Sequence, residues 1–195
     1  MGIAKLTSVF GIAAMSASAM LLARIPVKER FVASHEAYAL PVSADVSRTL
    51  LPDGRVFEVH GAQGWADLVG GTVARQRVTL PQIRRFASVT VMPTGQVLLW
   101  GGRDAQGHVL ATGEWFEPGT QRFIHAAHLN LPARAAHTLT VLTDGRLLMT
   151  GGMSIQGVPV TTALLWDPRQ RQTSPVVGSV GPRLEAHANL EADGS

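Results

Sequence analysis

Between residues 135 and 150 the spacing of apolar and polar residues predicts a β-hairpin. Ala135 to Leu142 alternates and is rich in Thr, Val and Leu, which predicts a strand with one buried face. Asp144 and Gly145 then predict a tight turn. The nearly all-apolar stretch Arg146 to Thr150 predicts a return strand that is covered on both faces. The Gly151-Gly152 pair ends this strand, because glycine allows close backbone approach.

Two more strands are predicted to complete the same unit. Val160 to Pro168 is apolar and closes on a proline, which cannot donate to the next residue of a sheet ladder. The polar segment from Arg169 to Gln172 predicts a turn, and Thr173 to Val177 predicts a weak outer strand. Four strands in about 50 residues are typical of one blade of a β-propeller.

The unit repeats along the chain. Each of the following residues recurs 50 positions later: Arg84 as Arg134, Gly95 as Gly145, Gly101 and Gly102 as Gly151 and Gly152, and Pro118 as Pro168. A further copy begins at Arg183 and reaches only as far as Asp193-Gly194, while a degenerate earlier copy carries its turn at Asp53-Gly54. We therefore predict an all-β domain over residues 43–195, divided into units 43–83, 84–133, 134–182 and an incomplete 183–195.

These units resemble kelch repeats of the bacterial and galactose-oxidase-like type. The resemblance rests on an Arg opening, a threonine-rich strand, the turn, the double glycine and an aromatic-acid-proline phrase. That phrase is "WFEPGTQRF" from Trp115 to Phe123 and "LWDPRQRQT" from Leu165 to Thr173, where Thr173 departs from the aromatic pattern. The resemblance implies a kelch-type β-propeller. Propellers have about four to eight blades, so the resemblance also implies that this propeller is incomplete. The chain would then assemble with further blades, belong to a longer protein or be a gene remnant.

The first 39 residues predict an export leader. A positive start is followed by the uncharged stretch Leu6 to Ala23, and basic residues come next. This pattern favours an N-terminal hydrophobic helix that is either cleaved or kept as a membrane anchor. The expected location is therefore outside the cell or in the cell envelope, with membrane contact only through this segment.

Charge and cysteine content narrow the classes of function. The net charge is +3, and four arginines cluster at Arg75, Arg77, Arg84 and Arg85. No aromatic ladder accompanies them, so we expect a solvated strand edge and no nucleic-acid partner. The chain has no cysteine, which excludes disulfides, thiolate metal sites and cysteine nucleophiles.

Repeated polar residues are predicted to support the blades. Three arginines recur at the heads of units: Arg84, Arg134 and Arg183. They either line the central entrance as a basic ring or form ion pairs between blades with acids such as Glu117 or Asp167, and we favour the ion pairs. His137 is expected to hydrogen-bond backbone, and no histidine spacing predicts a metal site or cofactor. Trp100, Trp115 and Trp166 are expected to form core between blades.

Variable loops carry the predicted function. Ala62 to Gly71, Arg103 to Leu110 and Met153 to Pro159 are predicted to project from one end and to bind a protein or a carbohydrate. The candidate binding residues are Trp65, Arg103, Asp104 and His108. The resemblance also raises, as the alternative, the propeller part of a larger copper radical oxidase. The copper site of that family needs tyrosine, histidine and cysteine, and because this chain offers only Tyr38 and no cysteine, a further C-terminal part would have to supply the site. We therefore predict a non-catalytic binding or scaffold module without cofactor or catalytic residues.

Overall fold

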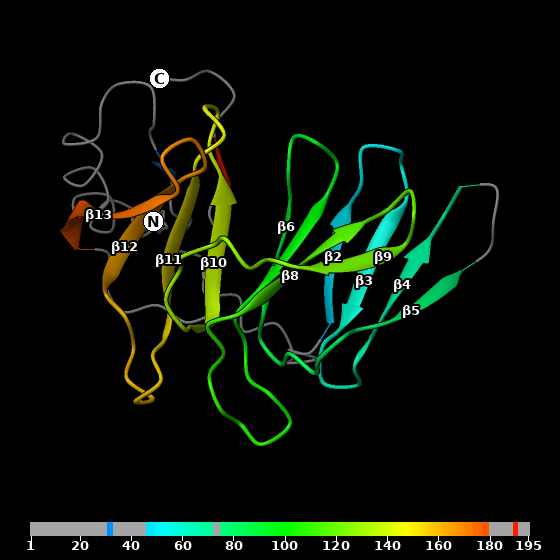
Figure 1. Cartoon of the computed structure of the whole chain (residues 1–195), viewed down its shortest axis with the longest axis horizontal. Coiled ribbons are helices and arrows are strands. Elements are labelled where there is room, and N and C mark those ends of the chain that lie inside the picture. The colour runs from blue at the N-terminus through cyan, green and yellow to red at the C-terminus, as the bar shows by residue number, and fades with distance from the viewer. Residues whose placement is uncertain (1–30, 33–45, 72–74, 180–188, 191–195) are drawn as a thin grey trace, which may run out of the picture.

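Three antiparallel sheets of four strands make up most of the described structure, which is a computed structural model covering residues 31–32, 46–71, 75–179 and 189–190 (Figure 1). Blade 1 contains β2 (Val46–Leu50), β3 (Val56–His60), β4 (Trp65–Val69) and β5 (Gln76–Thr79). Blade 2 contains β6 (Ser88–Val91), β7 (Val97–Trp100), β8 (Gly113–Glu117) and β9 (Arg122–His125). Blade 3 contains β10 (Ala135–Val141), β11 (Leu147–Met153), β12 (Thr162–Asp167) and β13 (Gln172–Ser179). A separate pair joins β1 (Phe31–Val32) to β14 (Asn189–Leu190).

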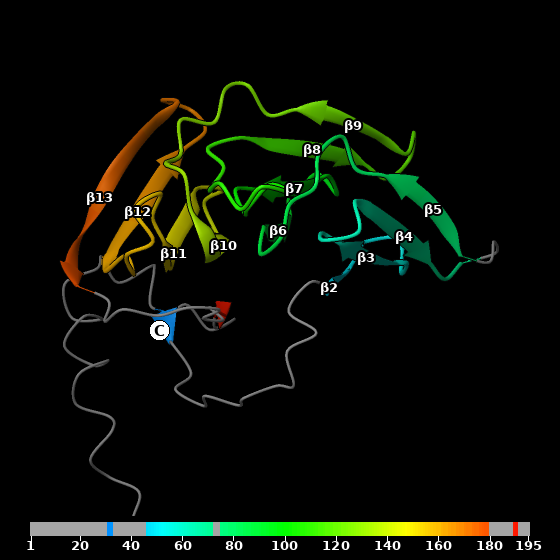
Figure 2. The same ribbon diagram turned by 90° about the horizontal axis from the view of Figure 1, so that it is seen from below.

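The three blades stand in a fan. Figure 2 shows the first strands of the blades, β2, β6 and β10, along the inside of the arc and the last strands, β5, β9 and β13, along the outside. Strand order follows chain order in every blade, so each is a simple meander. The described part of the chain is all-β and contains no helix, and within it no segment could cross a bilayer as a helix.

The hairpin between the first two strands has the same geometry in all three blades. Leu51, Met92 and Leu142 each donate their N–H to the carbonyl four residues later and accept from the glycine of the turn. Those glycines, Gly54, Gly95 and Gly145, have φ between 82° and 86°. This left-handed conformation explains why the turn retains glycine in every unit.

Alternating side chains fill the contacts between blades, which we call seams. In the first seam, Phe57 and Val59 of blade 1 pack with Val97, Leu99 and other apolar residues of blade 2. The rings of Phe57 and Phe116 stack with centroids 4.4 Å apart. Phe123, the late aromatic residue of its unit, packs on Phe116 at the outer side.

The second seam joins blades 2 and 3. Leu98 and Trp100, on the opposite face of β7 from the first seam, pack with Leu147, Met149 and Trp166. Trp115 is partly buried against the same cluster. The expectation that all three of these tryptophans form core is therefore confirmed.

One predicted loop is wrong. Ala62 to Gly71 contains the strand β4 and only a short turn before it. The glycines at both ends suggested a loop, but Ala66 and Leu68 point into the first seam and pair with Val59 and Phe57. Most of the predicted leader and most of the incomplete last unit lie outside the described residues.

Candidate functional site

Two loops of similar construction project from one end of the fan (Figure 1). One spans residues 103–110 after β7, and the other spans residues 153–159, beginning at the last residue of β11. In the first, Asp104 N–H bonds the carbonyl of His108 and Gly107 N–H bonds the carbonyl of Asp104. Ser154, Val158 and Gly157 repeat these bonds 50 positions later. The main-chain frame of the two loops is thus the same.

The tips of these loops differ in chemistry. Asp104 accepts bonds from the backbone N–H groups of Gln106 and His108, and its other carboxylate oxygen lies 3.0 Å from His108 Nδ1. In the loop of blade 3, Ile155 and Val158 are 66% and 58% exposed. A polar, charged tip therefore stands beside an apolar one, because the frame is made by main-chain bonds and leaves the side chains at the tips free to differ.

Three of the four predicted binding residues come together here. Arg103 bonds the carbonyl of Gly107 at 2.8 Å, and its guanidinium lies 4.0 Å from the sulfur of Met153 in the second loop. Arg103, Asp104 and His108 therefore belong to one surface. Trp65 does not belong to it, because it begins β4 and is stacked on His60 with centroids 3.5 Å apart.

A buried ion pair supports this end of blade 2. The guanidinium of Arg84 donates to both carboxylate oxygens of Glu114, at 2.5 and 2.7 Å. It also bonds the carbonyls of Gly101 and Thr112. Arg84 and Glu114 are 1% and 6% exposed, so Arg84 does not line a basic entrance. The acidic partner of Arg84 is Glu114, not the predicted Glu117. Glu117 lies three residues along the strand and therefore on the other face.

Blade 3 has the same arginine without the acid. Arg134 is 3% exposed and bonds the carbonyl of Gly151 at 3.2 Å and the Thr162 hydroxyl at 3.4 Å. Within the described ranges no carboxylate pairs with it, so the predicted pair with Asp167 is wrong. Leu164 occupies the position of Glu114, since Leu164 pairs with Met149 as Glu114 pairs with Leu99. Burial lowers the pKa of Arg134.

His137 lies next to this arginine at the start of β10. It is 6% exposed, and neither ring nitrogen has a hydrogen-bond partner among the described residues, contrary to the expected bond to backbone. Burial, with a smaller contribution from the Arg134 charge, lowers its pKa to about 3. The Arg134 carbonyl opposes this shift without reaching hydrogen-bond geometry. The ring is therefore neutral at physiological pH.

The outer face of blade 1 carries a charged cluster that sequence reasoning did not find. Ligand atoms of Glu58, His60 and Asp67 lie within 4.8 Å of one another, a spacing that could hold a cation. Arginines already occupy both carboxylates: Arg48 and Arg75 bind Glu58, and Arg75 and Arg77 bind Asp67. Hydrogen bonding by Arg77 lowers the pKa of Asp67. The cluster is thus a ladder of ion pairs across the four strands.

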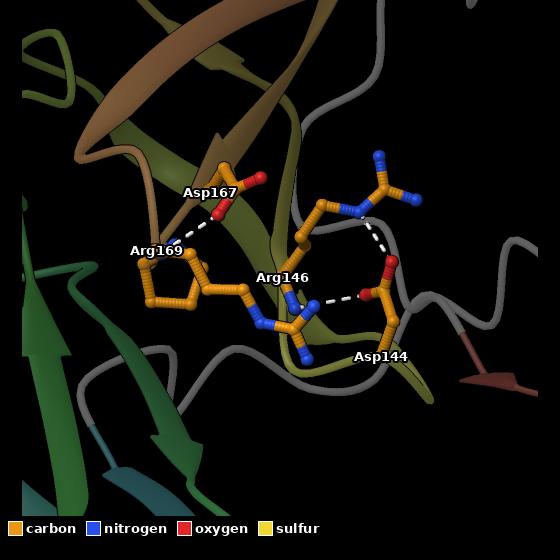
Figure 3. A pocket seen from close by; sticks show the side chains of 5 residues that line it. Asp144, Arg146, Asp167 and Arg169 are labelled. Atoms are coloured by element: carbon orange, nitrogen blue, oxygen red, sulfur yellow. Dashed lines mark hydrogen bonds and ion pairs between the residues drawn. The ribbon is translucent and has the colours of Figure 1, made fainter.

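A hollow lies at the opposite end of blade 3 from the loops. It is lined by Asp144 and Arg146 of one hairpin and by Asp167, Pro168 and Arg169 of another (Figure 3). Both carboxylates bond backbone N–H groups of their own turns. The two carboxylates therefore close their turns, and the hollow lies apart from the loop surface.

Comparison of the units would have found the missed residues. Alignment at a spacing of 50 sets Glu114 opposite Leu164, which marks Arg134 as lacking an acid. In β3, Glu58 and His60 alternate with apolar residues, whereas β7 of the next unit is wholly buried. A strand that alternates between polar and apolar residues, at a position where another unit has a wholly apolar strand, has one polar face. Such a face is not expected to pack against an apolar sheet.

Three fanned meanders of four antiparallel strands define a β-propeller-like fold. No protein-family model matches the chain, and no curated protein matches it. Among solved structures it is similar to one described as "Structure of YjhT", with 14% sequence identity and a TM-score of 0.57. The match covers 71% of this chain and 52% of the other, so the chain spans about half the length of that protein. This likeness supports the fold alone.

Proposed function

We propose that the chain is a non-catalytic, exported kelch-type module that binds a protein through the loops at 103–110 and 153–159. The observation that carries this proposal is the repeated loop frame with its two different tips. The frame fixes both loops through main-chain bonds, while Ile155, Val158 and His108 present side chains to solvent. Binding surfaces are commonly built from such loops on a rigid scaffold.

The chemistry of the tips favours a protein over a carbohydrate. Ile155 and Val158 offer aliphatic surface, and Arg103 and the Asp104–His108 pair border it with charge. An apolar centre with a polar rim is typical of protein interfaces. Trp65, the aromatic residue most suited to stacking on a sugar, is held between His60 and Arg77.

Peptide selection tests the proposal. Peptides from a random displayed library are selected on the wild-type chain, and their Kd is measured on the double variant Ile155→Ser/Val158→Ser. We expect binding to weaken about 10- to 100-fold, because two apolar contacts are lost. The matched control is Thr120→Ala, an exposed turn residue at the opposite end, which should bind as the wild type does. Two results would refute the proposal. One is selected peptides that bind the double variant as well as the wild type, and the other is a wild-type chain that binds an array of glycans but no peptide.

A further inference from the structure

Each seam contains an equivalent arginine site, and the two sites differ in whether a carboxylate is present. The complete site in the first seam shows which group the second site lacks. In blade 2, Arg84 is surrounded by the Gly101 carbonyl, Thr112 and the Glu114 carboxylate. In blade 3, Arg134 is bonded to the Gly151 carbonyl and Thr162, each 50 positions later. The part of the site that is missing is the carboxylate, because Leu164 stands in its place.

This missing group leaves a buried positive charge without an opposing one among the described residues. In blade 2 the carboxylate binds Arg84 through Nε and one terminal nitrogen. Among the described residues Arg134 has two hydrogen bonds, both to neutral oxygens and both from its terminal nitrogens. Buried guanidinium groups are ordinarily paired, since an unpaired buried charge is strongly unfavourable.

A second buried polar group lies against the same site. His137 has two ring nitrogens without partners in the described structure, and the Arg134 charge contributes to keeping its ring neutral. Both residues surround Gly101: a Cβ there would lie 2.3 Å from the Arg134 carbonyl and 2.9 Å from His137 Cε1. A neutral imidazole retains one N–H donor, so an anion here could be bound by two side chains.

We propose that Arg134 binds a carboxylate that comes from outside the seam, as Arg84 binds that of Glu114. Thr162, whose hydroxyl bonds Arg134, is exposed, so the carboxylate would reach Arg134 from the side of Thr162. The 3% exposure of Arg134 restricts the ligand to a small group such as a monocarboxylate or the side chain of an acidic residue. Arginine matches a carboxylate through two parallel hydrogen bonds.

Thermal unfolding with sodium acetate tests this site in the full chain. We expect the wild-type Tm to rise saturably, by about 4 °C at ten times the Kd. Leu164→Glu supplies the carboxylate within the chain, so its Tm should respond to acetate only through ionic strength. An equal acetate response in the wild type and Leu164→Glu would overturn the proposal.

The first seam provides a second test that does not depend on the folding of Leu164→Glu. Glu114→Leu turns the blade 2 site into a copy of the blade 3 site, so acetate should raise its Tm more than that of the wild type. No additional rise would overturn the proposal. The NMR signal of His137, assigned by comparison with His137→Ala, should also titrate at higher pH when acetate is bound.

A second ligand distinguishes the two possible sources of the carboxylate, a free small acid and an acidic side chain of a partner. N-acetyl-aspartate amide carries the side-chain carboxylate of a peptide. A Tm response to acetate alone assigns the site to a free small acid, and a response to both assigns it to an acidic side chain of a partner. The double variant Ile155→Ser/Val158→Ser should keep the response, so failure of the loop proposal and failure of this one are distinguishable.

Discussion

The two seams bury similar apolar clusters but treat polar groups differently. The first seam contains Arg84, which bonds both carboxylate oxygens of Glu114. Ala87 comes directly before the inner strand β6. The second contains Arg134 without a described acid, and His137 stands where the first has Ala87. Apolar packing alone would make the seams equivalent. We infer that the second seam responds to anions through Arg134 and to pH through His137.

The largest expected effect comes from making the first seam resemble the second. Glu114→Gln removes the negative charge and leaves Arg84 buried and unpaired. We expect the free energy of unfolding to fall by about 3–5 kcal/mol, as for other buried ion pairs that lose one partner. Urea denaturation of the variant and the wild type measures this loss. A loss below about 1 kcal/mol would mean that the pair does not support the seam.

The next effect is a pH dependence of the second seam. The folded pKa of His137 is about 3, below its ordinary value of 6.5, so the unfolded chain takes up the proton first. Stability is therefore full above pH 6.5 and is lost as the pH falls from there toward 3. Between pH 6.5 and 5 we expect a loss of about 2 kcal/mol, at roughly 1.4 kcal/mol per unit.

The control for this prediction is His137→Ala, which copies the residue of the first seam. Denaturation midpoints at pH 7, 6 and 5 should decline more steeply in the wild type than in the variant, which keeps the contribution of His60, whose pKa is also lowered by burial. Equal declines in the two chains would assign the pH dependence to other groups. The range stops at pH 5 because carboxylates with lowered pKa values, such as Asp67, lose their ion pairs at lower pH.

The smallest effect is expected outside both seams. Asp67 occupies the register position of Glu114 in blade 1, and its side chain is fully buried. Its partners Arg75 and Arg77 are more than half exposed, so they regain water when the pair is lost. Asp67→Asn should cost about 1 kcal/mol, far less than Glu114→Gln. A loss as large as that of Glu114→Gln would show that exposure of the arginines does not decide the difference.

The blades could be predicted from sequence because they depend on local signals. Turn glycines with positive φ and alternating strands mark β6, β7 and β10 to β12 in the chain itself. The partners of buried polar groups depend on contacts between units, and the strand period alone could not choose between Glu114 and Glu117 for Arg84. Trp65 was placed in a loop for the same reason, because its strand is recognised by pairing with β3.

The ladder of ion pairs on blade 1 also has a consequence for how such chains lengthen by duplication. Blade 2 offers an apolar residue, Leu99, to the blade before it, and blade 3 offers Met149, so either unit could be copied and inserted behind another. Blade 1 offers Glu58 at that position. A copy of blade 1 inserted farther along would place carboxylates against an apolar sheet. The faces of these units therefore favour duplication of blade 2 or blade 3 over duplication of blade 1.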